Sequence, residues 1–367
     1  MPKKIMLIIG ARPNFIKAAP LMRELSAHTE KFDPFLIHTG QHYDHNLSQL
    51  FFEQLKMPQP DIYLGVGSGS HARQTAKIMT GLEEEFEKNR PDLVIVFGDV
   101  NSTLAASIVT SKMCLKLAHV EAGLRSFDNT MPEEINRIVT DRLSDFLFIT
   151  EKSGSENLHK EGVSEDKVFF VGNIMIDSLV KNLELARESK IIEQLGIKAK
   201  EYAVLTLHRP ANVDNKDRLD ILLKAIGEVS QKLPVIFPCH PRTKNALSKF
   251  GFNFESNDNF KIIDPVGYLD FLNLQANARL VLTDSGGIQE ETTYLQIPCI
   301  TIRENTERPI TAEVGTNVLA GLEYDKIIKA ANNVFNGKHP KGRIPDLWDG
   351  HTAQRIIKTL EEIYDKF

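Results

Sequence analysis

The segment Asp284–Glu291 combines residue types that suit nucleotide binding. Its Ser-Gly-Gly turn follows an apolar run, residues 279–283, that predicts a buried strand, and it opens a predicted helix, Ile288–Gln296. Glycine leaves the backbone N–H groups of a helix N-terminus without a Cβ in the way, so the turn predicts an anion site, most often for phosphate. The carboxylates of Glu290 and Glu291 would repel a phosphate and suit hydroxyl groups such as those of a ribose. A plain helix cap with acidic first-turn residues is the alternative interpretation.

Carboxylates also follow two predicted strands in the first half of the chain. Asp99 follows the run 93–98, Glu121 lies near the end of the run 117–122, and Glu133 opens the next predicted helix. Acidic groups gathered at one edge repel each other, which favours a functional role such as proton transfer. Each alone has a simpler explanation: Asp99 could cap a helix, and Glu133 could form a surface ion pair with Arg137.

The second half of the chain carries histidine and arginine after its predicted strands. His208 and Arg209 follow one strand, and His240 and Arg242 follow the next. Together with the Ser-Gly-Gly turn, these residues suit a nucleotide diphosphate, although His208 alone could be structural. The first half therefore resembles a proton-transfer site, and the second half resembles a phosphate site.

These residues must be positioned by the elements that alternate along the chain. Short Val, Ile and Leu runs alternate with helical patterns, which is typical of parallel sheets covered by helices on both faces. We predict an α/β fold of two doubly wound domains, the first over 1–172 with a returning helix at 352–367, the second over 173–351. The predicted strands are 5–10, 34–39, 93–98, 117–122, 146–150, 168–172, 203–208, 235–239, 260–264, 280–284, 299–303 and 317–320.

The composition sets limits on the kind of protein. The 367 residues suit two domains, and a net charge of -5 without a basic stripe argues against nucleic acid as a partner. No apolar run is long enough to span a bilayer, and no signal peptide is expected at the N-terminus. Three scattered cysteines indicate reduced thiols, so we expect a cytoplasmic protein. His38, His42 and His45 lie close together, but no zinc-type spacing occurs, so no metal is predicted.

The motifs resemble those of the non-hydrolysing UDP-N-acetylglucosamine 2-epimerases. Their order matches over essentially the whole chain: Gly-Ala-Arg-Pro at 10–13, Gly-Asp at 98–99, Glu-Ala-Gly-Leu-Arg at 121–125, Pro-Glu-Glu at 132–134, His-Arg at 208–209, Asp-Ser-Gly-Gly at 284–287 and Thr-Glu-Arg-Pro at 306–309. The resemblance implies two Rossmann-like domains in a glycosyltransferase-B arrangement with an interdomain cleft. It also implies a homodimer that needs neither nicotinamide nor metal.

The resemblance further implies the reaction and the roles of matching residues. UDP is eliminated to give a 2-acetamidoglucal and is then added back, so that UDP-N-acetylglucosamine becomes UDP-N-acetylmannosamine, a precursor of surface polysaccharides. By motif, the acid–base groups are Asp99, Glu121 and Glu133, without an assignment of acid and base. The other matches are Arg12, His208, Ser285, Gly286 and Gly287 at the diphosphate, Glu291 at the ribose, Phe271 at the uracil, and Lys17 and Arg308 at further positions of the site.

One segment departs from the pattern of relatives that use their substrate as an activator. Residues 40–47 read Gly-Gln-His-Tyr-Asp-His-Asn-Leu and lack the expected Arg and Leu-Asp. This departure argues against an activator site and leaves open epimerisation of UDP-2,3-diacetamido-glucuronic acid, whose uronate would need an extra cation such as Arg73 or Arg125. A UDP-sugar glycosyltransferase of the same fold is a separate alternative, against which the motifs of Glu121 and Glu133 together argue. A hydrolysing variant of the epimerase also stays open.

Overall fold

The computed structural model describes residues 1–41, 52, 55–252 and 259–367. The chain forms two compact units: unit 1 comprises Met1–Lys181 and Asp346–Phe367, and unit 2 comprises Asn182–Pro345. Helix α7 (Ile174–Arg187) runs from one unit into the other. The domain boundaries expected from the sequence, between residues 172 and 173 and between residues 351 and 352, stay a prediction.

Unit 1 is built on a seven-stranded parallel sheet with the order β3-β2-β1-β4-β5-β6-β7. The five residues of β4 are all buried, as expected for a strand covered on both faces. The two-residue strand β3 was not predicted, because it is too short to show a hydrophobic period. The strands are β1 (Lys3–Ile9), β2 (Phe32–His38), β3 (Ile62–Tyr63), β4 (Leu93–Phe97), β5 (Lys116–Ala122), β6 (Phe146–Ile149) and β7 (Val168–Phe170).

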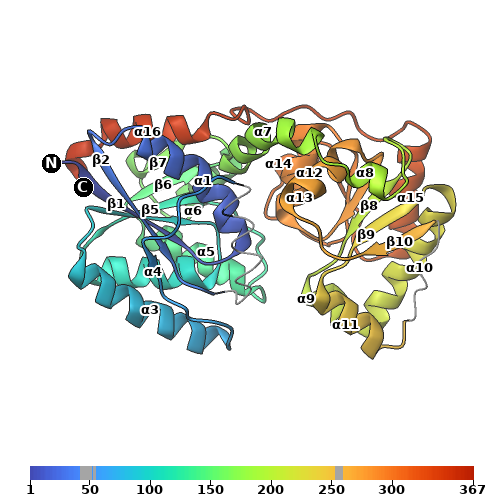
Figure 1. Ribbon diagram of the computed structural model, residues 1–367, viewed down its shortest axis with the longest axis horizontal. Coiled ribbons are helices and arrows are strands. Elements are labelled where there is room, and N and C mark those ends of the chain that lie inside the picture. The colour runs from blue at the N-terminus through green and yellow to red at the C-terminus, as the bar shows by residue number, and fades with distance from the viewer. Residues whose placement is uncertain (42–51, 53–54, 253–258) are drawn as a thin grey trace. The chain divides into compact units, whose positions relative to one another are not determined.

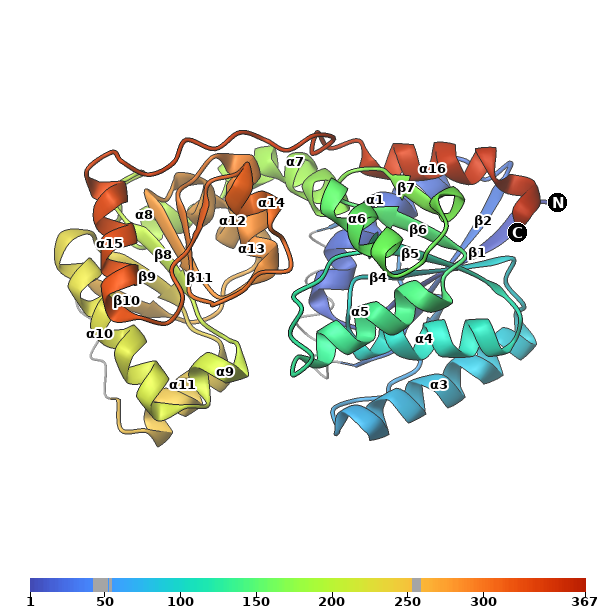
Figure 2. The same ribbon diagram turned by 180° about the vertical axis from the view of Figure 1, so that it is seen from behind.

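Helices cover both faces of the first sheet. In both views α3 and α4 lie on one face, while α1 and α16 lie on the other (Figures 1 and 2). Apolar side chains of α3 and α4, among them Ile78, Leu82 and Val109, form one buried cluster with those of β1, β4 and β5. The helices of this unit besides α7 are α1 (Arg12–Ser26), α3 (His71–Lys88), α4 (Asn101–Lys112), α5 (Pro132–Leu143), α6 (Lys152–Lys160) and α16 (Thr352–Glu362).

The segment that follows unit 2 returns to unit 1. The carboxylate of Asp177 on α7 accepts hydrogen bonds from the backbone N–H groups of Thr352 (3.0 Å) and Ala353 (2.7 Å) at the start of α16. The buried indole of Trp348 donates its Nε1–H to the backbone oxygen of Thr150 at 3.1 Å. The last residues are thus part of the core of unit 1.

Unit 2 is built on a six-stranded parallel sheet with the order β10-β9-β8-β11-β12-β13. All six strands were predicted from their apolar runs. They are β8 (Ala203–Thr206), β9 (Val235–Pro238), β10 (Phe260–Ile263), β11 (Leu280–Thr283), β12 (Cys299–Thr301) and β13 (Asn317–Leu319). The helices are α8 (Ile191–Gln194), α9 (Pro210–Val213), α10 (Lys216–Lys232), α11 (Pro241–Lys249), α12 (Tyr268–Asn277), α13 (Gly286–Leu295), α14 (Ile310–Glu313) and α15 (Tyr324–Phe335).

Each sheet has one point where the strand order reverses. In unit 1 it lies between β1 and β4, and in unit 2 it lies between β8 and β11. Ligands of doubly wound sheets bind beyond the carboxyl ends of the strands at such a point. Asp99 therefore lies at one of these points, and His208 and Ser285 lie at the other.

Candidate active site

The first group of candidate residues gathers where β1, β4 and β5 end. Glu121, 2% exposed, forms an ion pair with Lys17 of α1, which is 4% exposed. A Cβ on Gly98 would meet the Lys17 Nζ at 2.8 Å and would lie 3.9 Å from the Glu121 Oε1. The φ of Gly98 is +61°, which favours glycine, and any larger residue there would also displace the ammonium of Lys17. The structure brings together Lys17, Glu121 and the segment that leads into Asp99.

The backbone of Glu121 is in an unusual conformation. Its φ is +76°, in the left-handed region, and the pairing of β5 with β6 shifts register between Val120 and Ala122. A non-glycine residue in this region is strained by about 1–3 kcal/mol and persists only where its surroundings hold it. His119, two residues earlier, contacts Asp141 of α5 at 2.6 Å, whereas Glu121 contacts α1. The bulge therefore directs the carboxylate of Glu121 to Lys17, away from the helix that His119 contacts.

Asp99 is held by an arginine of α5. The Nε and Nη2 of Arg137 donate to the Asp99 Oδ2 at 3.0 and 2.8 Å, and Arg137 also pairs with the buried Glu134. A surface ion pair of Glu133 with Arg137 was the simpler interpretation of this sequence. The structure instead buries Arg137 and leaves Glu133 exposed in the first turn of α5, because Glu134 and Arg137 lie three apart on the inward face of the helix.

The second group of candidate residues gathers where β8 and β11 end. The carboxylate of Asp284 is fully buried and accepts hydrogen bonds from the backbone N–H groups of His208 and Arg209 and from the Nδ2 of Asn212. Its Oδ1 also lies 2.9 Å from the Nδ1 of His208, whose side chain is 51% exposed. Burial raises the pKa of Asp284, but the imidazole of His208 and the backbone N–H groups of His208 and Arg209 outweigh burial and lower the pKa. Asp284 thus orients an exposed imidazole at the end of β8.

The Ser-Gly-Gly turn begins α13, as predicted. Ser285 is the N-cap residue of α13, and its backbone N–H donates to the Oγ1 of Thr283 at 2.9 Å. That donor was expected to be open for an anion, so the turn offers its N–H groups only from Gly286 onward. A Cβ on Gly286 would meet the Nη1 of Arg308 at 2.4 Å. The guanidinium of Arg308 therefore lies beside the positive end of α13, which suits a diphosphate.

Arg308 is embedded among carboxylates. It is 5% exposed, its Nε lies 2.9 Å from the Oε1 of Glu290, and its Nη1 donates to the Oε1 of Glu307 at 2.5 Å. Glu307 also accepts from the Nη2 of Arg303 at 2.7 Å. The two carboxylates fix the guanidinium against the turn.

Glu291 lies one helical position beyond Glu290 and is 4% exposed. Burial, assisted by the nearby charge of Glu290, raises the pKa of Glu291 from 4.5 to about 8, although hydrogen bonds with Gln275 and Tyr268 oppose the rise. Phe271, the predicted uracil platform, is half-buried against the apolar cluster on the same side of unit 2 as Ile288. The predicted ribose and uracil residues thus lie on the neighbouring helices α13 and α12.

Because the pKa of Glu291 is raised, we expect the stability of the folded protein to depend on pH. Between pH 4.5 and about 8 the folded protein keeps a proton that the unfolded chain has released, so stability falls as pH rises through this window. Glu291→Gln cannot release a proton, so it should melt at a higher temperature than the wild type near pH 8, by roughly 2–4 °C for each kcal/mol gained. Thermal melts at pH 5, 6, 7 and 8 measure this, and the difference should shrink towards pH 5. A constant difference across all four pH values would contradict the raised pKa.

Two expectations fall partly outside the described residues. The backbone of Arg12 begins α1, but the placement of its side chain is not described. Of the histidines considered as metal ligands, His42 and His45 are not described either. Among the described residues, no group of three or more His, Cys, Asp or Glu side chains could hold a metal ion. No helix in the described part of the chain is long and apolar enough to cross a membrane.

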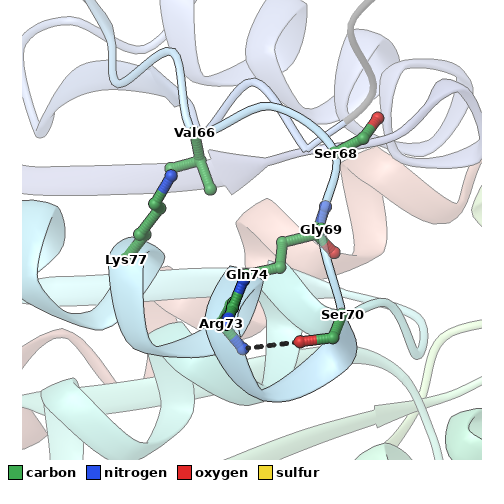
Figure 3. A pocket seen from close by; sticks show the side chains of 7 residues that line it. All are labelled: Val66, Ser68, Gly69, Ser70, Arg73, Gln74 and Lys77. Atoms are coloured by element: carbon green, nitrogen blue, oxygen red, sulfur yellow. Dashed lines mark hydrogen bonds between the residues drawn. The ribbon is translucent and has the colours of Figure 1, made fainter.

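A separate hollow of about 440 Å³ lies at the N-terminus of α3 (Figure 3). The Oγ of Ser70 accepts a hydrogen bond from the backbone N–H of Arg73 at 3.5 Å and caps the helix. Gln74 donates to the backbone oxygens of Gln41 and Gly67. In the sequence, residues 40–47 are the segment that differs from relatives with an activator site. Residues 42–47 of that segment lie outside the described residues.

The comparison with known proteins covers nearly the whole chain. Residues 23–361 match the family described as UDP-N-acetylglucosamine 2-epimerase. The chain belongs to this family. Its members are enzymes, isomerases by activity, and the predicted glycosyltransferase-B-like fold of two Rossmann-like units is confirmed.

Three known members of the epimerase family illustrate the similarity. A UDP-N-acetylglucosamine 2-epimerase of Methanococcus maripaludis is 46% identical over 97% of this chain and 98% of its own. A UDP-2,3-diacetamido-2,3-dideoxy-D-glucuronate 2-epimerase of Pseudomonas aeruginosa is 40% identical over 98% of this chain and 100% of its own. The crystal structure of the Methanocaldococcus jannaschii UDP-GlcNAc 2-epimerase with UDP-GlcNAc and UDP superposes with a TM-score of 0.91, at 44% identity, over 98% of this chain and 99% of that one.

Several residues of the site were not among those predicted for this epimerase. Arg137, which is paired with Glu134, holds Asp99; Asp284 holds His208, and Glu307 holds Arg308. Glu134, Asp284 and Glu307 lie within the motifs that carry the family resemblance. Arg137 lies three residues after the last residue of the Pro-Glu-Glu motif. The signal that could have revealed them is adjacency to a predicted site residue, since a charge beside a functional charge commonly orients it.

Proposed function

We propose that the protein catalyses the reversible 2-epimerisation of UDP-N-acetylglucosamine to UDP-N-acetylmannosamine, which supplies precursors of surface polysaccharides. The observation that carries the proposal is the buried Glu121 carboxylate, which a strained backbone holds against Lys17 at the end of β5, the strand next to the β1/β4 strand-order reversal where Asp99 lies. Such a cluster suits proton transfer at a weakly acidic carbon.

In the proposed reaction, unit 1 carries out the proton transfers. A carboxylate removes the proton from the second sugar carbon while the bond from the first carbon to UDP breaks, which gives 2-acetamidoglucal and UDP. A protonated group then delivers a proton to the opposite face of the second carbon, and UDP adds back to the first. Asp99, Glu121 and Glu133 supply the acid and base groups, because inversion needs one on each face of the ring.

Unit 2 is proposed to hold the UDP. The backbone N–H groups of Gly286 and Gly287 lie at the positive end of α13, and Arg308 lies beside them, so the charge that develops on departing UDP would be stabilised there. His208, oriented by Asp284, would donate to the diphosphate. Ser285 and Arg12 are assigned to the diphosphate, Glu291 to the ribose and Phe271 to the uracil by the family resemblance.

The proposed chemistry uses neither nicotinamide nor metal, because both steps are proton transfers coupled to breaking or making one carbon–oxygen bond. A homodimer in the cytoplasm stays a prediction from the sequence.

An exchange experiment in heavy water tests the proposed reaction. UDP-N-acetylglucosamine is incubated with the protein and followed by NMR. The mannosamine product should carry deuterium at its second carbon, because the proton that is added back comes from a residue in exchange with solvent. The same sample should contain remade UDP-sugar rather than free sugar.

Other outcomes would identify other reactions. A glycosyltransferase would leave the second carbon without deuterium, and a hydrolysing enzyme would accumulate free N-acetylmannosamine and UDP. Product formed without deuterium would contradict the elimination mechanism.

A second candidate substrate is UDP-2,3-diacetamido-glucuronic acid, favoured by the 40% identity to the Pseudomonas aeruginosa enzyme. Its uronate would need an additional cation. Arg125 does not suit this role, because all three nitrogens of its buried guanidinium already contact Asp141, Glu161 or the backbone oxygen of Leu124. Arg73 is exposed and is the remaining candidate of the two. The same NMR experiment with this substrate distinguishes the two reactions.

A further inference from the structure

Helix α5 contacts Asp99 through both its side chain and its backbone. Arg137 donates twice to the Asp99 Oδ2, at 3.0 and 2.8 Å, and Asn136 donates from its Nδ2 to the Asp99 backbone oxygen at 2.8 Å. Both donors of Arg137 converge on one carboxylate oxygen, and Asn136 holds the backbone of the same residue, so the two contacts together fix the direction of the carboxylate.

Glu134 connects this arginine to the loop before α5. Its carboxylate, 1% exposed, pairs with Arg137 and accepts from the backbone N–H groups of Ser126 (3.0 Å) and Phe127 (2.8 Å). Phe127 is 79% exposed and has a φ of +57°, a conformation that needs support from its surroundings. One carboxylate thus holds the arginine and the strained turn together.

The side chains of Glu134, Arg137 and Asp99 form a network that is buried at one end and open to solvent at the other. The side chains of Glu134 and Arg137 are 1% and 3% exposed, whereas that of Asp99 is 22% exposed. Burying two charges is expensive unless they are well paired, and an apolar pair of similar size is often at least as stable. Stability alone therefore does not explain why charged residues stand here in place of apolar ones. Of the three side chains, that of Asp99 is the one exposed enough to meet a substrate.

We infer that Glu134 and Arg137 are positioning residues that fix the direction of the Asp99 carboxylate for proton transfer. Glu134 sets the orientation of Arg137 and, through the same carboxylate, the backbone of the 126–127 turn. This inference rests on the proposed epimerase function, because it assigns the network to the proton-transfer step of that reaction.

Replacing Arg137 by lysine tests the inference with the charge retained. Lysine has no rigid fork of donors that could hold Asp99 and Glu134 at the same time, so Asp99 loses its fixed direction. We expect kcat for deuterium incorporation to fall about 10- to 100-fold, the usual effect of a misplaced catalytic group, while KM and UDP affinity change less than about twofold. Arg142→Lys, an exposed position on the same helix, is the matched control and should retain wild-type kcat.

A double-mutant cycle separates positioning from a loss of stability. Glu134→Gln should lower kcat in the wild-type background, but it should cause no further loss in an Asp99→Asn background, because it acts through Asp99. A purely structural role would lower kcat by the same factor in both backgrounds and would overturn the inference. So would wild-type kcat in Arg137→Lys. Should Glu134→Gln fail to fold, Arg137→Lys in the same two backgrounds gives the same comparison.

The failure of the inference is distinguishable from the failure of the proposed function. Wild-type protein that incorporates no deuterium from either UDP-sugar would overturn both. Active wild-type protein with unaffected Arg137→Lys and Glu134→Gln variants would overturn the inference alone.

Discussion

Glu121→Gln is expected to lower turnover by roughly two to four orders of magnitude, the usual contribution of a positioned acid or base. Glutamine keeps the shape of the side chain but cannot exchange a proton with the substrate. Glu121 is buried, paired with Lys17 and held by a bulge, so no neighbouring group can easily take its place. NMR measurement of deuterium incorporation and of product formation provides the rate. Asp99→Asn and Glu133→Gln should show losses of the same order.

The specificity of the Glu121 effect can be checked within the same unit. Glu156→Gln, at an exposed position of α6, should keep wild-type turnover. Affinity for UDP in the Glu121→Gln variant should stay close to that of the wild type, because Glu121 is not among the residues assigned to UDP. If all three carboxylate variants stay fully active, the cluster in unit 1 is structural and the proposed mechanism is wrong.

Asp284→Ala is expected to destabilise unit 2 by roughly 3–5 kcal/mol, the range for removing one partner from a buried charged network. The change leaves the N–H groups of His208 and Arg209 and the Nδ2 of Asn212 without the acceptor that they share. It also releases the imidazole of His208, so UDP affinity should fall together with stability. Urea unfolding measures the first effect, and calorimetric titration with UDP at low temperature measures the second.

The matched control is Asp264→Ala, since Asp264 also follows a strand of unit 2 but its side chain is 89% exposed. This variant should lie within about 0.5 kcal/mol of the wild type. An Asp284→Ala variant that unfolds at the same urea concentration as this control would show that the hydrogen bonds to Asp284 contribute little.

The strands could be predicted from the sequence because both faces of each sheet are covered. Runs such as Leu93–Phe97 are apolar throughout, and they stand apart from the periodic patterns of the helices between them. The turn at Ser285–Gly287 could be predicted for the same reason, since its glycines follow such a run directly. The short strand β3 gave no such signal, because two residues cannot show a period.

Other features of the site depend on contacts between distant segments. The left-handed backbone of Glu121 is set by the bulge and by Lys17, which lies 104 positions earlier in the chain, and no local residue type announces it. Arg137 looked like a surface partner of Glu133, because an i, i+4 spacing fits that pair. Its partners are Asp99 and Glu134, and the contact with Asp99 depends on the fold, which brings the segment after β4 next to α5. Burial of Glu291 likewise depends on α12, which supplies Tyr268 and Gln275.

The order in which the chain is synthesised has a consequence for the two units. Unit 2 is one continuous stretch, Asn182–Pro345, whereas unit 1 needs Asp346–Phe367 in addition to its first 181 residues. During translation the whole of unit 2 leaves the ribosome before Trp348 and α16 can fill their places in unit 1. The incomplete unit 1 therefore exposes the apolar surface that α16 covers on α1 for the time needed to make about 180 residues, which is roughly 10 to 40 seconds at ordinary synthesis rates. Nascent chains of this protein are accordingly expected to depend on chaperones at their N-terminal rather than their central segment.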